Sequence, residues 1–247
     1  MAVSAAAPRD YRGMSGGQVA RAIREDFGPQ TMLSFSRGKD SIATWLSLRG
    51  AFEPADIIPY YLYIVPGLLS FERESLDYFE NDVFGRKIIT LPHPGLFRML
   101  GNLILQPADR IAVLQAANLP AFDYHDVHAA VKQTEGINHR VMVASGLRAA
   151  DSPQRRLSML HNGPVSLAND QFYPVFDWNK HRLIEEISRS GIKLPEDYHL
   201  FGRSFDGLDM RFLLPLKRHK PADYRRVLEW FPFADLEIWM LEKRGVI

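Results

Sequence analysis

The chain has 247 residues, no cysteine and a formal net charge of +1, and 46% of its residues are hydrophobic. This length and composition suit a soluble globular protein with one sizeable domain, or a core domain with a C-terminal extension. The near-zero net charge argues against a globally basic nucleic-acid binder. The lack of cysteine excludes disulfides, zinc–thiolate sites, iron–sulfur clusters and thiol redox chemistry.

Neither a membrane segment nor a secretion signal is expected. No apolar run approaches the roughly 18 residues that indicate a membrane helix. The opening residues 1–7 have no basic start and no long apolar stretch. We therefore expect no membrane partner, a cytoplasmic location and a flexible N-terminal tail over residues 1–15.

Strands alternate with helices along much of the chain. Residues 18–27 have the helical spacing of Val19, Ile23 and Phe27 and are followed by a Gly-Pro stop. Five strands are expected at residues 31–35, 57–65, 87–91, 140–145 and 171–176, and helices at 71–84, 180–190 and, broken near Pro107 and Pro120, at 95–135. This alternation predicts an α/β fold with a mainly parallel five-stranded sheet, flanked by helices in right-handed crossovers.

The pattern changes after about residue 195. Charged residues, Gly202 and Gly207 precede an end rich in Trp and Phe, and no repeat or low-complexity linker marks a boundary. We therefore expect a nucleotide-binding core domain over residues 16–195. A mostly helical C-terminal extension, residues 196–247, should pack on it.

An octet after the first predicted strand carries the strongest functional signal. It reads Ser34-Phe35-Ser36-Arg37-Gly38-Lys39-Asp40-Ser41 and precedes a helix-like stretch. Backbone N–H groups and a helix N-terminus in such a strand–loop–helix setting can hold a phosphate. A Walker A loop would need a further glycine, and Ser or Thr where Asp40 stands. A polar turn that only caps a helix is the plainer alternative.

The octet resembles the Ser-Gly-Gly-x-Asp-Ser loop of the PP-loop ATP pyrophosphatases. Its form suggests the branch that includes phosphoadenosine phosphosulfate (PAPS) reductases and sulfurylases. Residues 146–156 resemble that branch's Gly-Ile-Arg-x-x-Glu-Ser-x-x-Arg segment, with Asp151 in place of glutamate, and residues 173–178 resemble its Pro-(Ile/Leu)-x-Asp-Trp segment. The resemblance spans roughly residues 30–195. It implies a sheet like that of the adenine nucleotide alpha hydrolases. It also implies a cysteine-free branch of the family, of the type carried by phages and mobile elements.

The chain departs from that family at two points. Arg37 stands where the family usually has a glycine, which would allow positive φ and close approach to pyrophosphate oxygens. Arginine could add a charge-assisted contact to the same oxygens, or adapt the loop to another anion. The reductases also need a catalytic cysteine, so we expect shared nucleotide binding without shared redox activity.

The resemblance implies an enzyme that uses ATP and Mg²⁺ and cleaves ATP between the α and β phosphates to adenylate an unidentified acceptor. The expected nucleotide-binding residues are Ser34, Ser36, Gly38 and Ser41 at the pyrophosphate, Tyr63 near the adenine, and Arg148, Arg155 and Arg156 as an anion clamp. The expected catalytic residues are Lys39 and Arg37, which neutralise the leaving pyrophosphate, and Asp40, which helps to place the metal. In the segment 173–178, Asp177 is expected to cap the helix at 180–190.

Alternatives remain open at this stage. The fold could bind PAPS or a similar adenine nucleotide as a transferase or sensor. The basic residues 217–226 could instead direct the protein to nucleic acid beside a nuclease-like companion, although a solvated helix face is the plainer interpretation. Residues 198–209 could contact a second substrate through Arg203, Asp206 and Asp209, or form a plain turn. The sequence does not set the oligomeric state, and a homodimer is one state that it allows.

Overall fold

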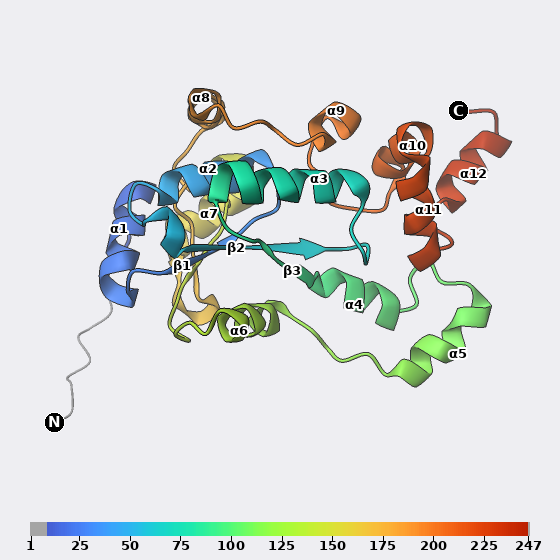
Figure 1. Cartoon of the computed structure of the whole chain (residues 1–247), viewed down its shortest axis with the longest axis horizontal. Helices are drawn as coiled ribbons and strands as arrows, with labels where there is room; N and C mark the ends of the chain where they lie inside the picture. Colours follow the sequence, from blue (N-terminus) through green and yellow to red (C-terminus); the bar gives the residue numbers. More distant parts are fainter. Residues whose placement is uncertain (1–8, 247) are drawn as a thin grey trace. The chain divides into compact units, whose positions relative to one another are not determined.

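The computed structural model describes residues 9–246 (Figure 1). The expectations for residues 1–8, a flexible tail without a secretion signal, lie outside the described residues. Residues 9–15 were assigned to the same tail, but they contact helix α1 (Gly16–Phe27). Arg9 pairs with Glu25 at 2.8 Å, and the buried Tyr11 donates a hydrogen bond to Asp26 at 2.8 Å. Packing of the chain therefore begins before residue 16.

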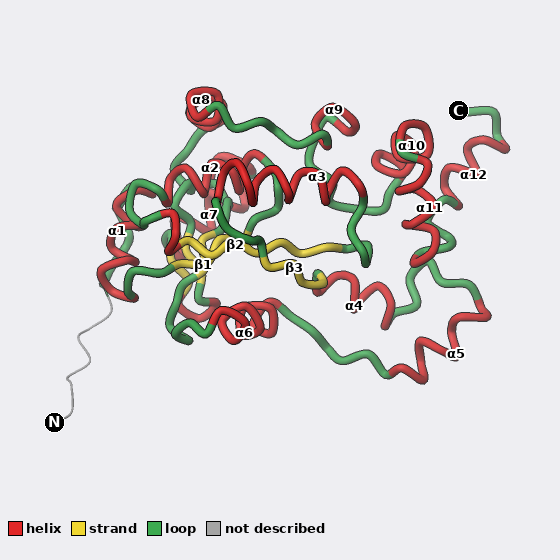
Figure 2. The backbone as a smooth tube through the Cα atoms, viewed as in Figure 1, coloured by secondary structure: helices red, strands yellow, loops and turns green. Residues whose placement is uncertain are grey.

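The fold is α/β with a mostly parallel sheet flanked by helices, which confirms the predicted class. The sheet has six strands in the order β3-β2-β1-β4-β6-β5. Their bounds are β1 Thr31–Ser34, β2 Ile57–Tyr63, β3 Ile89–Pro92, β4 Val143–Ala144, β5 Val165–Ser166 and β6 Gln171–Phe172. Figure 2 shows strands in yellow, with β1, β2 and β3 labelled. β1 pairs parallel with β4, β2 with β3, and β4 with β6.

The prediction of five strands was wrong, because β5 adds a sixth. It pairs antiparallel with β6, with Val165 opposite Phe172. Its two residues follow Pro164 in a largely polar stretch, so no apolar run indicated a strand there. The chain turns back at Asp170, which has φ of 52°, a left-handed conformation that Asp tolerates better than most residues.

The helices largely follow the predicted pattern. The remaining ones are α2 Lys39–Leu48, α3 Ser70–Tyr78, α4 Pro94–Gly101, α5 Ala108–Ala117, α6 Tyr124–Glu135, α7 Pro153–Asn162, α8 Lys180–Ser190, α9 Asp197–Phe201, α10 Met210–His219, α11 Pro221–Trp230 and α12 Leu236–Lys243. A π-helical turn, Phe79–Phe84, continues α3 to the predicted end. The longest helices of residues 9–246 have 12 residues, and none in this part of the chain has the length and apolar character to cross a membrane.

The chain divides into two compact units. The first contains residues up to 33, 40–58 and 140–190, and the second contains residues 34–39, 59–139 and 191 onward. Each unit thus combines segments that are distant in sequence. The C-terminal helices belong to the second unit together with the middle of the chain.

The second unit has a hydrophobic core built largely by its C-terminal helices. The buried members are Val65, Leu69, Phe71, Leu96, Leu100, Phe205, Phe212, Leu213, Leu216, Tyr224, Val227, Phe231, Ala234 and Ile238. They come from the loop between β2 and α3, from α3 and α4, from α10, α11 and α12, and from the segments that precede and join these last helices. Residues after 196 therefore share one core with residues 65–100.

Candidate functional site

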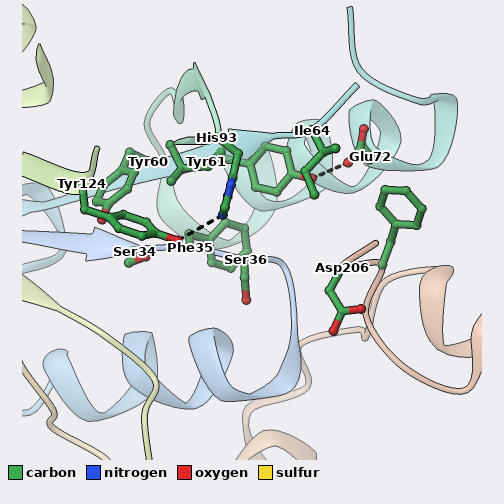
Figure 3. A pocket seen from close by; sticks show the side chains of 12 residues that line it. Ser34, Phe35, Ser36, Tyr60, Tyr61, Ile64, Glu72, His93, Tyr124 and Asp206 are labelled. Atoms are coloured by element: carbon green, nitrogen blue, oxygen red, sulfur yellow. Dashed lines mark hydrogen bonds between the residues drawn. The ribbon is translucent and has the colours of Figure 1, made fainter. Parts of the chain in front are cut away.

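A cavity of about 280 Å³ lies in the second unit beside the start of the octet (Figure 3). Its polar side chains are Ser34, Ser36, Glu72 and Asp206, and its aromatic side chains include Tyr60, Tyr61, His93, Tyr124 and Phe205. Ligand cavities usually measure about 300–1,000 Å³. This cavity therefore suits a small ligand of roughly nucleoside size.

Two neighbouring tyrosines of β2 anchor the cavity wall to different helices. Successive strand residues point to opposite faces. The Tyr60 hydroxyl lies 3.3 Å from Nε2 of His128 on α6, whereas Tyr61 donates a hydrogen bond to Glu72 on α3. α3 and α6 thus lie on opposite faces of β2 (Figure 1). Both residues line the cavity, so hydrogen bonds on both sides of the strand fix this part of the wall.

His93 and Tyr124 form a hydrogen-bonded pair at one end of the cavity (Figure 3). The Gly95 N–H donates to His93 Nδ1 at 2.8 Å, so Nδ1 is unprotonated and the ring proton of the neutral imidazole is on Nε2. Nε2 lies 3.1 Å from the Tyr124 hydroxyl and donates to it. Burial lowers the pKa of His93, and the nearby Arg98 charge lowers it further. This arrangement leaves the Tyr124 hydroxyl hydrogen able to donate to a ligand.

Glu72 has a buried side chain at the other end of the cavity. It accepts hydrogen bonds from the Tyr61 hydroxyl and, at 2.8 Å, from the Leu69 N–H. Its carboxylate also lies 3.7 Å from the Arg37 guanidinium. Burial raises the pKa of Glu72 although the Arg37 charge opposes this shift, and burial also raises the pKa of Tyr61. Tyr61 therefore keeps its proton and acts as the donor.

Arg37 points into the core of the second unit. Its side chain is 1% exposed, and its two terminal nitrogens lie 2.8 and 3.0 Å from the two carboxylate oxygens of Asp197. The guanidinium also lies over the rings of Tyr61 and Phe71, at 5.2 and 5.4 Å from their centroids. The Arg37 backbone has φ of 63°, the left-handed conformation that glycine adopts without strain. The expected contact of Arg37 with pyrophosphate is thus replaced by a buried ion pair.

Residues 197–206, which we call the clasp, cover the octet within the second unit. The Lys39 N–H donates to the Tyr198 hydroxyl at 2.8 Å. A Cβ atom at Gly38 would lie 3.1 Å from the Ser204 hydroxyl oxygen. A phosphate oxygen that takes the Lys39 N–H must therefore displace the Tyr198 hydroxyl.

The clasp is fixed by its own acidic residue. Asp197 is fully buried and, besides binding Arg37, accepts a hydrogen bond from the Phe205 N–H at 2.8 Å. Phe205 and Asp206 then enter the cavity wall. Asp206 also pairs with Arg203 at 2.5 Å, while Asp209 caps α10 by accepting from the Arg211 N–H. Of the three charged residues expected to contact a second substrate, Arg203, Asp206 and Asp209, only Asp206 lines the cavity.

In the first unit, the end of β4 meets the last part of the octet. Arg148 is buried and its Nε lies 2.9 Å from the Asp40 carboxylate, while its Nη2 lies 2.6 Å from Asp151. A Cβ atom at Gly146 would lie 2.8 Å from the carbonyl carbon and oxygen of Asp40. The segments at 40–41 and 146–156, identified separately in the sequence, therefore lie side by side.

The expected arginine clamp is only partly assembled. Arg155 pairs with Asp151 at 2.7 Å, so this one aspartate bridges Arg148 and Arg155. Arg156 is exposed on α7. Two of the three guanidinium groups are thus held by the single aspartate of the same segment, Asp151.

Two further expectations differ from the structure. Tyr63 does not line the cavity. It packs against the hydrophobic core of the second unit, whereas its neighbours Leu62 and Ile64 line the wall. Asp177 is not the cap of α8. The Asn179 side chain accepts from the Arg182 N–H at 2.8 Å, because this residue stands directly before the helix.

The remaining octet residues differ in exposure. Ser36 is exposed, Ser34 and Lys39 are partly buried, and Gly38 and Ser41 are buried. Ser41 lies in the first turn of α2, where backbone N–H groups are unpaired within the helix. The exposed Ser36 and the partly buried Ser34 are the octet hydroxyls that reach the cavity.

Several cavity residues carry no signal in the sequence. His93, Tyr124 and Phe205 belong to no short motif, and Asp197 lies 160 positions from the arginine that it binds. A buried arginine needs an acidic partner. The sequence predicted neither the burial of Arg37 nor the position of that partner in the chain.

No protein-family model matches this chain, and a search of curated proteins finds no match.

Proposed function

We propose that this chain binds ATP and cleaves it between the α and β phosphates, with transfer of AMP to an acceptor. The observation that carries the proposal is that Ser34 and Ser36 of the octet line a cavity of nucleoside size with an aromatic wall. Purines stack favourably on aromatic side chains. The Tyr124 hydroxyl and the Asp206 carboxylate would supply polar contacts to the nucleoside.

The octet leads from this cavity to the start of α2 at Lys39. The N-terminus of a helix attracts phosphate through unpaired N–H groups and the helix dipole. The acceptor oxygen would form a bond to the α phosphorus as the bond from that phosphorus to the bridging oxygen breaks, and pyrophosphate leaves. Lys39 would stabilise the charge on the leaving group, and catalysis would depend on positioning and charge.

The proposal gives Asp40 and Arg37 supporting roles. Among residues 9–246 no group of three or more His, Asp or Glu side chains could hold a metal. Mg²⁺ is often held by one or two carboxylates together with substrate phosphates, so Asp40 fits as a single protein ligand, oriented by Arg148. Bound there, Mg²⁺ would neutralise phosphate charge. Arg37 would position the octet through Asp197.

The test is the product profile of the purified protein with Mg²⁺ and α-labelled ATP, alone and with added DNA or cell extract. AMP and pyrophosphate, or labelled acceptor, are the expected products. Lys39→Ala should lower the rate at least tenfold because it removes charge at the leaving group. Lys87→Ala is the matched control, since that side chain is 84% exposed and pairs with Glu80. ATP that remains intact under all conditions, with no binding, would refute the proposal.

A second candidate is a nucleotide sensor that binds without turnover. The clasp favours it, because the Lys39 N–H and the Arg37 charge both already have partners within the protein. The sensor predicts tight binding of ATP or PAPS, no labelled AMP and the same affinity in Lys39→Ala within a few fold. Turnover that depends on Lys39 would exclude it.

A further inference from the structure

Helix α12 carries apolar side chains on two sides. Ile238 is fully buried in the core of the second unit, whereas Leu236, Trp239 and Met240 are 49%, 51% and 39% exposed. Spacings of three and four residues place the exposed side chains on one stripe of the helix. Phe233, before the helix, and Trp230, at the end of α11, are exposed as well. Contiguous exposed apolar side chains of this kind mark an interaction surface.

The charges beside this stripe are arranged with opposite signs at its two ends. Glu237 and Arg244 are seven residues apart, about two helical turns, so they lie on the same flank. Both are exposed, and Arg244 still has helical backbone angles, with φ of −86° and ψ of −3°. An acid near the start of the helix is thus followed by a base at its end.

The opposite flank of α12 faces its own chain. Glu242 pairs with Lys217 of α10 at 2.7 Å, and Asp235 accepts a hydrogen bond from Tyr224 of α11 at 3.0 Å. These acidic groups are therefore already matched within the second unit. The flank with Glu237 and Arg244 is the one presented outward beside the apolar stripe.

We propose that α12 is the interface of a homodimer, in which two copies of the helix pair antiparallel about a two-fold axis near Trp239 and Met240. In such a contact, each flank of one helix faces the identical flank of the other helix. Glu237 of each subunit then lies beside Arg244 of the partner subunit. The antiparallel arrangement also brings opposite ends of the two helix dipoles together. This self-complementary charge pattern selects a second copy of the chain as the occupant.

The interface is small. Its apolar part on α12 consists of Leu236, Trp239 and Met240. Interfaces of limited area give weak, concentration-dependent association. We expect the full-length chain to pass from monomer to dimer over a concentration series. Sedimentation velocity measures this transition directly.

Single substitutions test the stripe. Trp239→Glu should leave the chain monomeric at concentrations where the unmodified chain is a dimer, because a charge at the centre of the contact must be desolvated. Val113→Glu is the control: Val113 is 68% exposed on α5 of the same unit, so this variant should dimerise normally. Circular dichroism and thermal melting show that each variant is folded. A monomer at every concentration of the unmodified chain, or dimerisation of folded Trp239→Glu, would overturn the proposal.

Charge reversal tests the antiparallel geometry. Glu237→Lys and Arg244→Glu each place like charges opposite one another, twice per dimer, so each variant alone should be mainly monomeric. A mixture of the two restores opposite charges at both contacts and should form a heterodimer. At raised salt the single variants should recover part of their association. Unimpaired dimers of the single variants, or a mixture that stays monomeric, would refute this geometry.

Discussion

Arg37 has a left-handed backbone and a buried charge at the same residue. The left-handed conformation costs about 1–2 kcal/mol for a residue with a Cβ atom. A glycine at this position would avoid that cost, but it could not bind Asp197 and Glu72, which are 0% and 1% exposed. The bidentate ion pair therefore offsets the strain and fixes the octet to the clasp. At this residue the tertiary contact overrides the local backbone preference.

Arg37→Gly is expected to lower the free energy of unfolding by roughly 1–4 kcal/mol. Loss of one partner of a buried ion pair typically costs about 3–5 kcal/mol, and the relieved strain returns about 1–2 kcal/mol. Adding Asp197→Asn to Arg37→Gly should restore part of the lost stability, because the double variant no longer buries an unpaired charge at residue 197. Denaturant unfolding of both single variants and the double variant measures the coupling.

An exposed ion pair provides the comparison. Arg189 pairs with Glu185 on α8, and its side chain is 66% exposed. Arg189→Ala should change the free energy of unfolding by less than about 1 kcal/mol. If Arg37→Gly were equally neutral, the buried pair would not hold the octet in place.

His93 makes stability depend on pH in a known direction. Its pKa is lowered in the folded protein, mainly by burial, so the unfolded chain binds the proton first as pH falls. The contribution of neutral His93 to the free energy of unfolding is complete above the unperturbed pKa of about 6.5 and declines below it. The free energy of unfolding should therefore fall between about pH 7.5 and pH 5.5, and less steeply in His93→Gln.

The exposed His161 on α7 supplies the control for this measurement. His161→Gln should retain the pH slope of the unmodified chain. Equal slopes for His93→Gln and the unmodified chain would assign the pH dependence to other groups. The Tyr124 contact would then have no part in it.

At the scale of elements, the clasp and the start of α2 share one hydrogen bond. The Lys39 N–H donates to the Tyr198 hydroxyl, so this donor is satisfied without a ligand. If the proposed function holds, a phosphate oxygen competes for the same N–H. The clasp then lowers affinity while it stabilises the ligand-free protein.

Tyr198→Phe should separate these two effects. Without the hydroxyl, the Lys39 N–H loses its acceptor, and the free energy of unfolding should fall by about 1 kcal/mol in the absence of nucleotide. ATP affinity should rise by up to about fivefold, because about 1 kcal/mol corresponds to that change in a dissociation constant. Denaturant unfolding and calorimetric titration measure the two quantities.

Tyr173→Phe is the matched control. Its hydroxyl donates to Gln171 at 3.3 Å within the first unit, so its loss should leave ATP affinity unchanged. A Tyr198→Phe variant with lower stability but unchanged affinity would show that the clasp does not compete with nucleotide. Equal loss of affinity in both variants would indicate a general effect of lost hydroxyls.

Elements with local signals were predictable, and contacts between distant segments were not. α8 was predicted at its observed bounds because a helical apolar pattern ends at Gly191, which has φ of 71°. β5 was missed because two residues carry no periodicity. The octet was recognisable as a loop, but the inward direction of Arg37 depends on Asp197, and no local pattern links residues 160 positions apart.

At the scale of the whole molecule, the chain passes repeatedly between its two compact units. The second unit takes residues 34–39 and 59–139 from the middle of the chain and everything after 190. Phe71 and Leu96 share a core with Phe212 and Phe231. A boundary at residue 195, as the composition suggested, therefore cuts through this core. It also separates Arg37 from Asp197.

A chain that ends at residue 195 should consequently fail to fold. It would expose the apolar partners of α10, α11 and α12, and leave the buried Arg37 without Asp197. We expect loss of cooperative unfolding and strong binding of a hydrophobic dye. A chain that ends at Arg244 keeps these helices and should unfold like the full-length protein. Cooperative unfolding of the shorter chain with near-native stability would instead establish residues 196–247 as a dispensable extension on a self-sufficient core.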